Sequence, residues 1–298
     1  MKINIPMKKV SIYTKLIVTE IIAILIFYKL KLNINFDWIS QILGISAFLF
    51  GLIIAFTISN RHNRLDEIRD KLREQDAVLL SIFYLSRRFS KSISNHLKKL
   101  IDEMLITQID YDLIDFDIEN PKKLRSLYNY IEDIKVNNKS QIEAHEKMLD
   151  AINNLLKIHE ALAYRVKNKM RAYEWISLLL LGGITFFCFI ALNNQSIESV
   201  LILSIFTSAI ALLFFILKEI ESLEWQESEW IWGPLANLFE ELELLPYFPE
   251  DVIDKQRVKV SNLTNSKKIR IANYPFPYPN MKNKKISIIS IKEGLPKK

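Results

Sequence analysis

The sequence has one cysteine, six glycines and four histidines in 298 residues. With Cys188 alone, the chain has no disulfide framework and no thiolate metal site, and we expect a small buried packing residue there. No glycines are spaced as in a dinucleotide-binding fingerprint or a phosphate-binding loop. The histidines lack paired metal spacing and nearby catalytic partners, and we expect them on helix surfaces. These absences argue against an enzyme and leave no cofactor or metal site to predict.

The most prominent feature of the sequence is a set of long apolar runs. Each approaches the roughly 20 residues that a helix needs to cross about 30 Å of hydrocarbon. Buried helices of a large soluble protein are the alternative, and the length and even apolarity of the runs count against it. The runs form two pairs separated by a long charged middle: 16–32, 38–59, 175–192 and 197–217. We therefore expect two transmembrane hairpins.

Basic residues lie mainly at one end of these spans. The loops at the other end offer only Lys29 and Lys31. Because cytoplasmic loops carry an excess of Lys and Arg, we expect a multi-pass protein of the inner or plasma membrane with both termini in the cytoplasm. The residues that set this orientation are Lys2, Lys8, Lys9, Lys15, Arg61, Arg64, Arg69, Lys71, Arg73, Arg165, Lys167, Lys169 and Arg171.

The predicted fold class is an all-α integral membrane protein with four transmembrane helices in two hairpins, a helical cytoplasmic region and a small C-terminal extended or β segment. Apolar residues recur at helical spacing through the middle of the chain, and Asn120 before Pro121 marks a helix boundary there. The expected divisions are a basic segment with the first hairpin (1–60), the cytoplasmic helical region (61–172), the second hairpin (173–218) and a cytoplasmic C-terminal helix with an extended tail (219–298).

The C-terminal part changes character along its length. Residues 223–245 are compatible with an amphipathic helix, and the prolines that follow exclude a continuous one. Short β-type runs occur at 257–260, 268–272 and 285–291. Aromatic residues alternate with proline over 274–279, where we expect an extended segment that docks on protein surface.

Two stripes with a period of four residues run along the second span. A stripe of small residues would let a neighbouring helix approach closely: Ala47, Gly51, Ala55 and Ser59. Beside it lies a bulky stripe: Phe48, Leu52 and Phe56. Such a bulky stripe commonly faces lipid or ordinary core. The other interpretation is a hydrophobic constriction, in which rings of apolar side chains gate a pore by dewetting.

Two short patches resemble the bestrophin channels. The stretch FTISNRHNRLDEIR resembles the end of the second bestrophin span through Phe56, Arg64, Glu67 and Arg69. The run YEWIS resembles the start of the third span in animal bestrophins through Tyr173, Glu174 and Trp175. This resemblance implies that Phe48, Leu52 and Phe56 form the apolar neck of a pore in a homopentamer that conducts small anions such as chloride.

The resemblance has limits after the fourth span. Bestrophins carry a proline motif there, followed in calcium-gated members by an acidic clasp, whereas this chain reads EWQESEWIW. Calcium gating is therefore not predicted. Within the first span, Glu20 is an intramembrane carboxylate, for which we expect an anchoring role at the headgroups or in a pair with Lys15.

Two classes of function remain open from the sequence. The first is an oligomeric ion channel whose partners are the lipid bilayer, further copies of the chain and small anions. The second is a membrane-anchored interaction or effector protein, in signalling or defence, whose cytoplasmic helices and tail bind a partner. No nucleic acid partner is expected.

Overall fold

The structure is a computed structural model that describes residues 11–30, 38–111, 113, 120–223, 225–226, 228–254, 257–258, 264, 266–274 and 283–290. Most of these residues are helical. The chain divides into two compact units. We call the first the span unit, which comprises Lys9–Leu65 and Lys169–Trp225. We call the second the head unit, which takes in Asp66–Asn168 and Gln226–Lys298.

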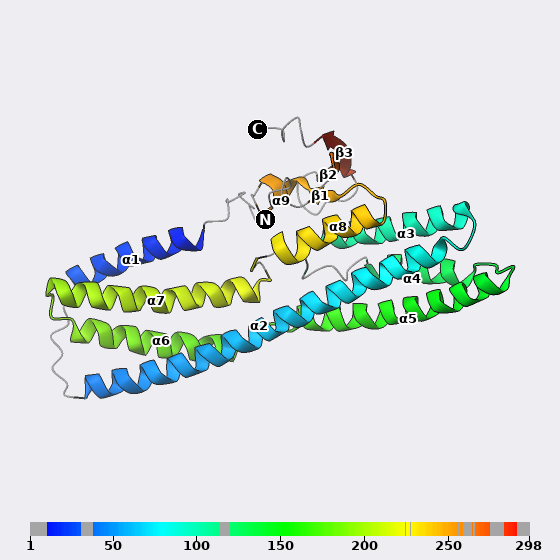
Figure 1. Ribbon diagram of the computed structural model, residues 1–298. Helices are drawn as coiled ribbons and strands as arrows, with labels where there is room; N and C mark the ends of the chain where they lie inside the picture. Colours follow the sequence, from blue (N-terminus) through cyan, green and yellow to red (C-terminus); the bar gives the residue numbers. More distant parts are fainter. Residues whose placement is uncertain are drawn as a thin grey trace. The chain divides into compact units, whose positions relative to one another are not determined.

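The span unit contains α1 (Ile12–Lys29), the first part of α2 (Ile39–Ser86), α6 (Ala172–Leu192) and α7 (Ile197–Glu221). Helix α1 packs along α7, and α6 also contacts α7 (Figure 1). Three helical stretches are long and apolar enough to cross a membrane: Ile39–Ser86, Lys139–Leu192, in which α6 supplies the apolar part, and Ile197–Glu221. Helix α1 is not among them, and its 18 residues include Lys15, Glu20 and Lys29.

Polar side chains fix the turn between α6 and α7. Ser196 caps α7, because its hydroxyl accepts a hydrogen bond of 3.1 Å from the backbone N–H of Ser199. The side-chain amide of Asn193 donates to the carbonyl of Phe27 at 2.6 Å and more weakly to that of Leu30 at 3.4 Å. These carbonyls belong to the last turn of α1 and the residue after it, so Asn193 satisfies acceptors that a helix end leaves open.

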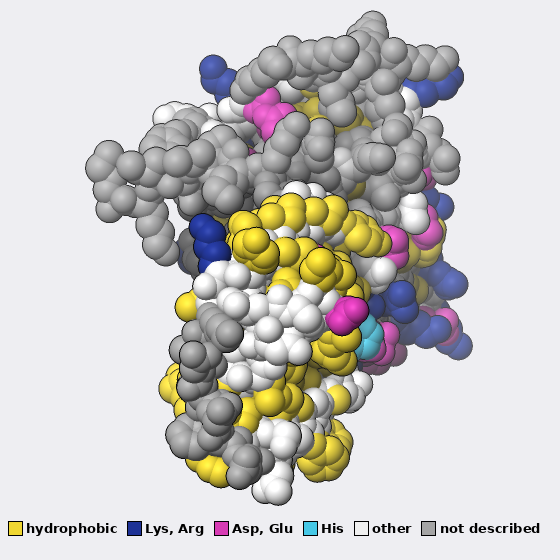
Figure 2. All heavy atoms as spheres, turned by 90° about the vertical axis from the view of Figure 1, so that its left-hand side faces the viewer, with side chains coloured by type: hydrophobic (Ala, Val, Ile, Leu, Met, Phe, Trp, Pro, Cys, Tyr) yellow, Lys and Arg dark blue, Asp and Glu magenta, His cyan; other side chains and the backbone are white. Residues whose placement is uncertain are grey.

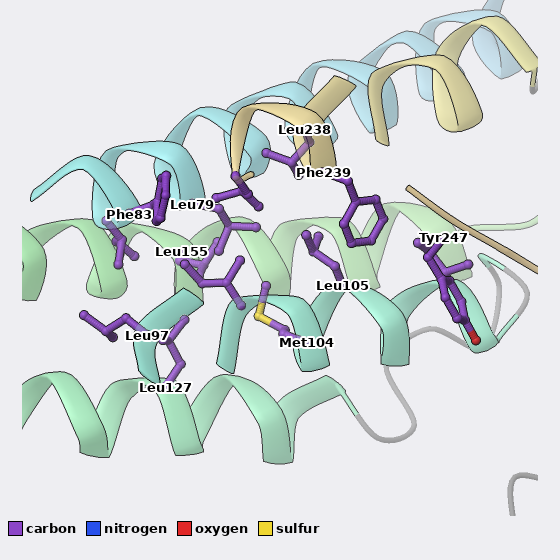
Figure 3. Close-up of a cluster of buried hydrophobic side chains, with 14 of the residues drawn as sticks. Leu79, Phe83, Leu97, Met104, Leu105, Leu127, Leu155, Leu238, Phe239 and Tyr247 are labelled. Atoms are coloured by element: carbon purple, nitrogen blue, oxygen red, sulfur yellow. The ribbon is translucent and has the colours of Figure 1, made fainter. Parts of the chain in front are cut away.

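The head unit packs helices around one apolar core (Figure 3). It contains the second part of α2, followed by α3 (Lys91–Asp110), α4 (Asn120–Glu132), α5 (Lys139–Lys167), a π-helical turn η2 (Ser228–Trp232), α8 (Gly233–Glu241) and α9 (Glu250–Asp254). The core draws on every one of the longer helices of this unit, as its labelled members show: Leu79, Phe83, Leu97, Met104, Leu105, Leu127, Leu155, Leu238, Phe239 and Tyr247.

A three-stranded sheet completes the head unit, with β1 (Tyr247–Pro249), β2 (Lys268–Asn273) and β3 (Lys285–Ser290) in that order. Strand β2 pairs parallel with β1 and antiparallel with β3. Arg270 on β2 makes a bidentate pair with Asp102 on α3, with both N–O distances 2.7 Å. Bidentate geometry fixes the orientation of both groups, so this pair sets how the sheet meets α3.

Several expectations from the sequence are confirmed. Strands β2 and β3 occupy the second and third β-type runs, α4 begins at Asn120, and Cys188 is buried. Two expectations are wrong. Residues 223–245 do not form one helix, because Leu223 and Gln226 adopt left-handed φ values of 61° and 51°. His159 is buried instead of lying on a helix surface. Most of the predicted run at 257–260 and of the aromatic and proline segment lies outside the described residues.

Candidate functional site

The bulky stripe of α2 lies on a face that the rest of the chain leaves open. Phe48, Leu52 and Phe56 are 68%, 43% and 66% exposed. On the opposite side of the helix, Phe50 and Ile54 are buried against residues of α6 and α7. Helix α2 is therefore held in the span unit by one side and presents the bulky stripe outward.

The small stripe is open in the same way. Ala47, Gly51 and Ala55 are exposed, and a Cβ added at Gly51 would meet no atom within 4 Å. The close approach of helices inside the protomer occurs elsewhere, at Gly182 on α6. A Cβ there would lie 3.3 Å from the ring of Phe214 on α7 and 3.5 Å from the ring of Phe50 on α2. Within this chain, Gly182 thus has the role in close helix approach that the sequence suggested for Gly51.

A cluster of charged residues ties together three segments where the apolar parts of the helices end. Arg64 on α2 lies 3.4 Å from the carboxylate of Glu221 at the end of α7. Arg61 lies 3.7 Å from the same carboxylate and 4.0 Å from that of Glu174 on α6. The backbone N–H of Met170, just before α6, donates to Glu221 at 2.6 Å. Two cations thus face two anions, and these ion pairs tie α2, α6 and α7 together.

The remaining residues of the two sequence patches divide between the units. In the head unit, Glu67 pairs with Arg165 of α5 at 2.7 Å. Arg69 pairs with Asp66 at 3.2 Å and lies over the ring of Trp230, 5.3 Å from its centroid. In the span unit, Trp175 packs on the core around Phe50 and Leu178, whereas Tyr173 is exposed. The first patch meets the second through Arg61 and Glu174.

Sequence reasoning did not identify Glu221 or Gly182, and it named Arg61 only for the orientation of the spans. Glu221 lies 157 positions from Arg64, and nothing local marks the two as partners. Gly182 and Gly183 are adjacent glycines inside a span, a signal for close helix packing that leaves open which of them is buried. The structure decides, since Gly182 is buried and Gly183 is exposed.

Comparison with known proteins places the chain in a family. The family model described as Bestrophin-like domain matches residues 36–222, more than half of the chain. The chain belongs to the bestrophin-like family. The bestrophin resemblance expected from the two patches is thereby confirmed. No curated protein and no solved structure matches the chain.

The bestrophin-like match runs from just before α2 to the end of α7, so it contains the bulky stripe, both patches and the charged cluster. Helix α1 and the sheet lie outside it. The apolar helices and the family together make this a membrane protein. Viewed from the end at which α7 begins, the side chains drawn for the span unit are mainly hydrophobic or uncharged (Figure 2).

Proposed function

We propose that this bestrophin-like protein is an oligomeric ion channel in which α2 lines the pore and Phe48, Leu52 and Phe56 form a hydrophobic neck. The observation that carries the proposal is the exposure of all three side chains on one face of α2, while Phe50 and Ile54 hold the opposite face in the protomer. A ring of copies with this face toward the axis would bring the bulky side chains together. Apolar rings of this kind close a pore to ions by excluding water.

The small stripe supports the assembly. Gly51 has open space beside it, and Ala47 and Ala55 continue the stripe one turn away on either side. In a membrane, helices associate through close packing of small residues, because lipid and side chains are equally apolar. The family resemblance supports a pentamer and small anions as the permeant ions. The four-span arrangement, which rests on the four apolar runs, belongs to the same proposal. So do the cytoplasmic termini, which rest on the Lys and Arg distribution.

The decisive experiment replaces all three neck residues with alanine in the full-length protein. The variant is reconstituted in liposomes, and anion flux is measured beside wild type. Smaller side chains widen and wet the neck, so we expect a severalfold rise in flux with the oligomer intact. The matched control is the triple variant Phe187→Ala, Phe206→Ala and Leu180→Ala, which has the same composition and lies on exposed faces of α6 and α7.

The control variant should keep wild-type flux, because its three residues face lipid in the proposed assembly. If both triple variants leave flux unchanged, α2 does not line a pore. A monomer in nanodiscs would count against the assembly directly. Either result would favour the alternative of a membrane-anchored interaction protein.

A further inference from the structure

Glu20 is a carboxylate that points toward a buried hydroxyl. It is half-buried in the middle of α1, and its Oε1 accepts a hydrogen bond of 2.8 Å from the Ser204 hydroxyl on α7. Ser204 is fully buried. The pair with Lys15 expected from the sequence does not form, because Lys15 instead lies 3.1 Å from Glu219 near the end of α7. The expected pair of Glu20 with Lys15 is therefore wrong.

The position of Ser204 along α7 sets how deep this contact lies in the membrane. This helix is one of the stretches able to cross a membrane, and Ser204 is its eighth residue. At 1.5 Å per residue, Ser204 lies about 10 Å from the start of the helix. Because the hydrocarbon core is about 30 Å thick, Glu20 meets Ser204 well inside the apolar layer when α7 spans it.

The packed helices supply no nearby cation in the residues that the structure describes. On α1 the charged residues are Lys15, which pairs with Glu219, and Lys29, nine positions away. On α7 the other charged residues lie toward the two ends: Glu198, Lys218, Glu219 and Glu221. Residues 39–60 of α2 and 175–192 of α6 contain no charged residue. An isolated ionised carboxylate is costly in such surroundings, and taking up a proton removes that cost.

Ser204 can serve both protonation states without moving. Its hydroxyl oxygen lies 2.8 Å from Glu20 and 2.9 Å from the carbonyl oxygen of Leu201. When Glu20 is ionised, the Ser204 hydroxyl donates to the carboxylate. When Glu20 is protonated, its O–H donates to the Ser204 oxygen, and the Ser204 hydroxyl donates to Leu201. Each state leaves every polar hydrogen with an acceptor.

From this geometry we propose that Glu20 and Ser204 form an intramembrane proton-binding site between α1 and α7. The family match begins at residue 36, so Glu20 lies outside the part of the chain that the family describes. The site does not depend on the chain being a channel.

The test uses dicyclohexylcarbodiimide, a hydrophobic reagent that partitions into membranes. The O–H of a carboxylic acid adds across one C=N bond of the reagent to give an O-acylisourea. Its acyl group then migrates from oxygen to nitrogen, which leaves a stable N-acylurea on the side chain with no leaving group. We expect this adduct on Glu20 in the full-length protein in liposomes, read by peptide mass, and rising as the pH is lowered. Glu219, held by Lys15, should stay unlabelled, and Glu20→Gln should remove the adduct.

Ser204→Ala separates the proposed role from simple packing. A hydrogen bond to a carboxylate is stronger than one from a carboxylic acid, so losing Ser204 favours the proton. Labelling of Glu20 at a fixed pH should therefore increase severalfold. Ser204→Thr keeps the hydroxyl and should leave the labelling unchanged. Ser208→Ala is the matched control, because this buried hydroxyl one turn away has no hydrogen-bond partner among the described residues.

Absence of the adduct on Glu20 in folded protein at every pH would overturn the proposal. Equal labelling by a water-soluble carbodiimide would also overturn it, since the carboxylate would then be in water. Unchanged labelling of Glu20 in Ser204→Ala would show that Ser204 is not part of the site. Because the readout is peptide mass and needs no ion flux, failure here and failure of the channel proposal are distinguishable.

Discussion

Three glycines in the span unit allow one substitution to be compared in three surroundings. At Gly182 an added Cβ would lie 3.3 Å from Phe214 and 3.5 Å from Phe50, so the larger side chain of Gly182→Leu has no space. Overpacking of this kind costs about 1–3 kcal/mol. At Gly183 and Gly51 nothing lies within 4 Å, so leucine fits within the protomer. The gain in helix propensity from replacing glycine is similar at all three positions and cancels in the comparison.

Thermal unfolding of the purified protein, followed by tryptophan fluorescence, should therefore rank Gly182→Leu well below Gly183→Leu. Mass measurement in nanodiscs then separates folding from assembly. Gly51→Leu should keep a folded protomer and lose the oligomer, because leucine blocks the small stripe only where another copy packs against it. Equal stability of Gly182→Leu and Gly183→Leu would refute the packing argument. An intact oligomer in Gly51→Leu would refute assembly through the small stripe.

Two further predictions concern pH and topology. Burial raises the pKa of Asp76 in the head unit to about 7. The folded state then holds this proton more tightly than the unfolded state. The contribution of Asp76 to the free energy of unfolding is therefore fully present below about pH 4. It is lost, by up to about 4 kcal/mol, as the pH rises through 7. Asp76→Asn should flatten this part of the pH profile of thermal unfolding, and an unchanged slope would contradict the assignment. For topology, in a Cys188→Ala background, Asn194→Cys should react with an impermeant thiol reagent in intact cells and Asn154→Cys should not. The reverse pattern would refute the proposed orientation.

The sequence predicts best what depends on local composition. The apolar runs that became α2, α6 and α7 are visible because crossing a membrane requires length and apolarity in one continuous stretch. Strands β2 and β3 were also predicted from short β-branched runs between turn residues. Strand β1 was not, since its three residues, Tyr247–Pro249, include a proline and are too few for a pattern.

What escaped prediction depends on contacts between distant segments. Glu221 finds Arg61 and Arg64 only after α2 and α7 are packed. The left-handed backbone at Leu223 could not be predicted from the sequence either. Non-glycine residues adopt positive φ only when tertiary contacts hold them there. Leu223 is buried, which supplies such contacts. The two stripes of α2 lie on exposed faces, and their proposed role stays a prediction, because it needs a second copy that one sequence does not contain.

The described residues of the head unit come from two stretches of chain, Asp66–Asn168 and Gln226–Lys298, and α6 and α7 are synthesised between them. Phe239 and Tyr247, both fully buried in its core, come from the later stretch. During translation the core around α3 therefore stays incomplete until the second hairpin has left the ribosome. Over that interval its apolar surface is open to chaperones and to aggregation. The order of events is thus set by the chain itself: synthesis of α6 and α7 comes before closure of the head unit.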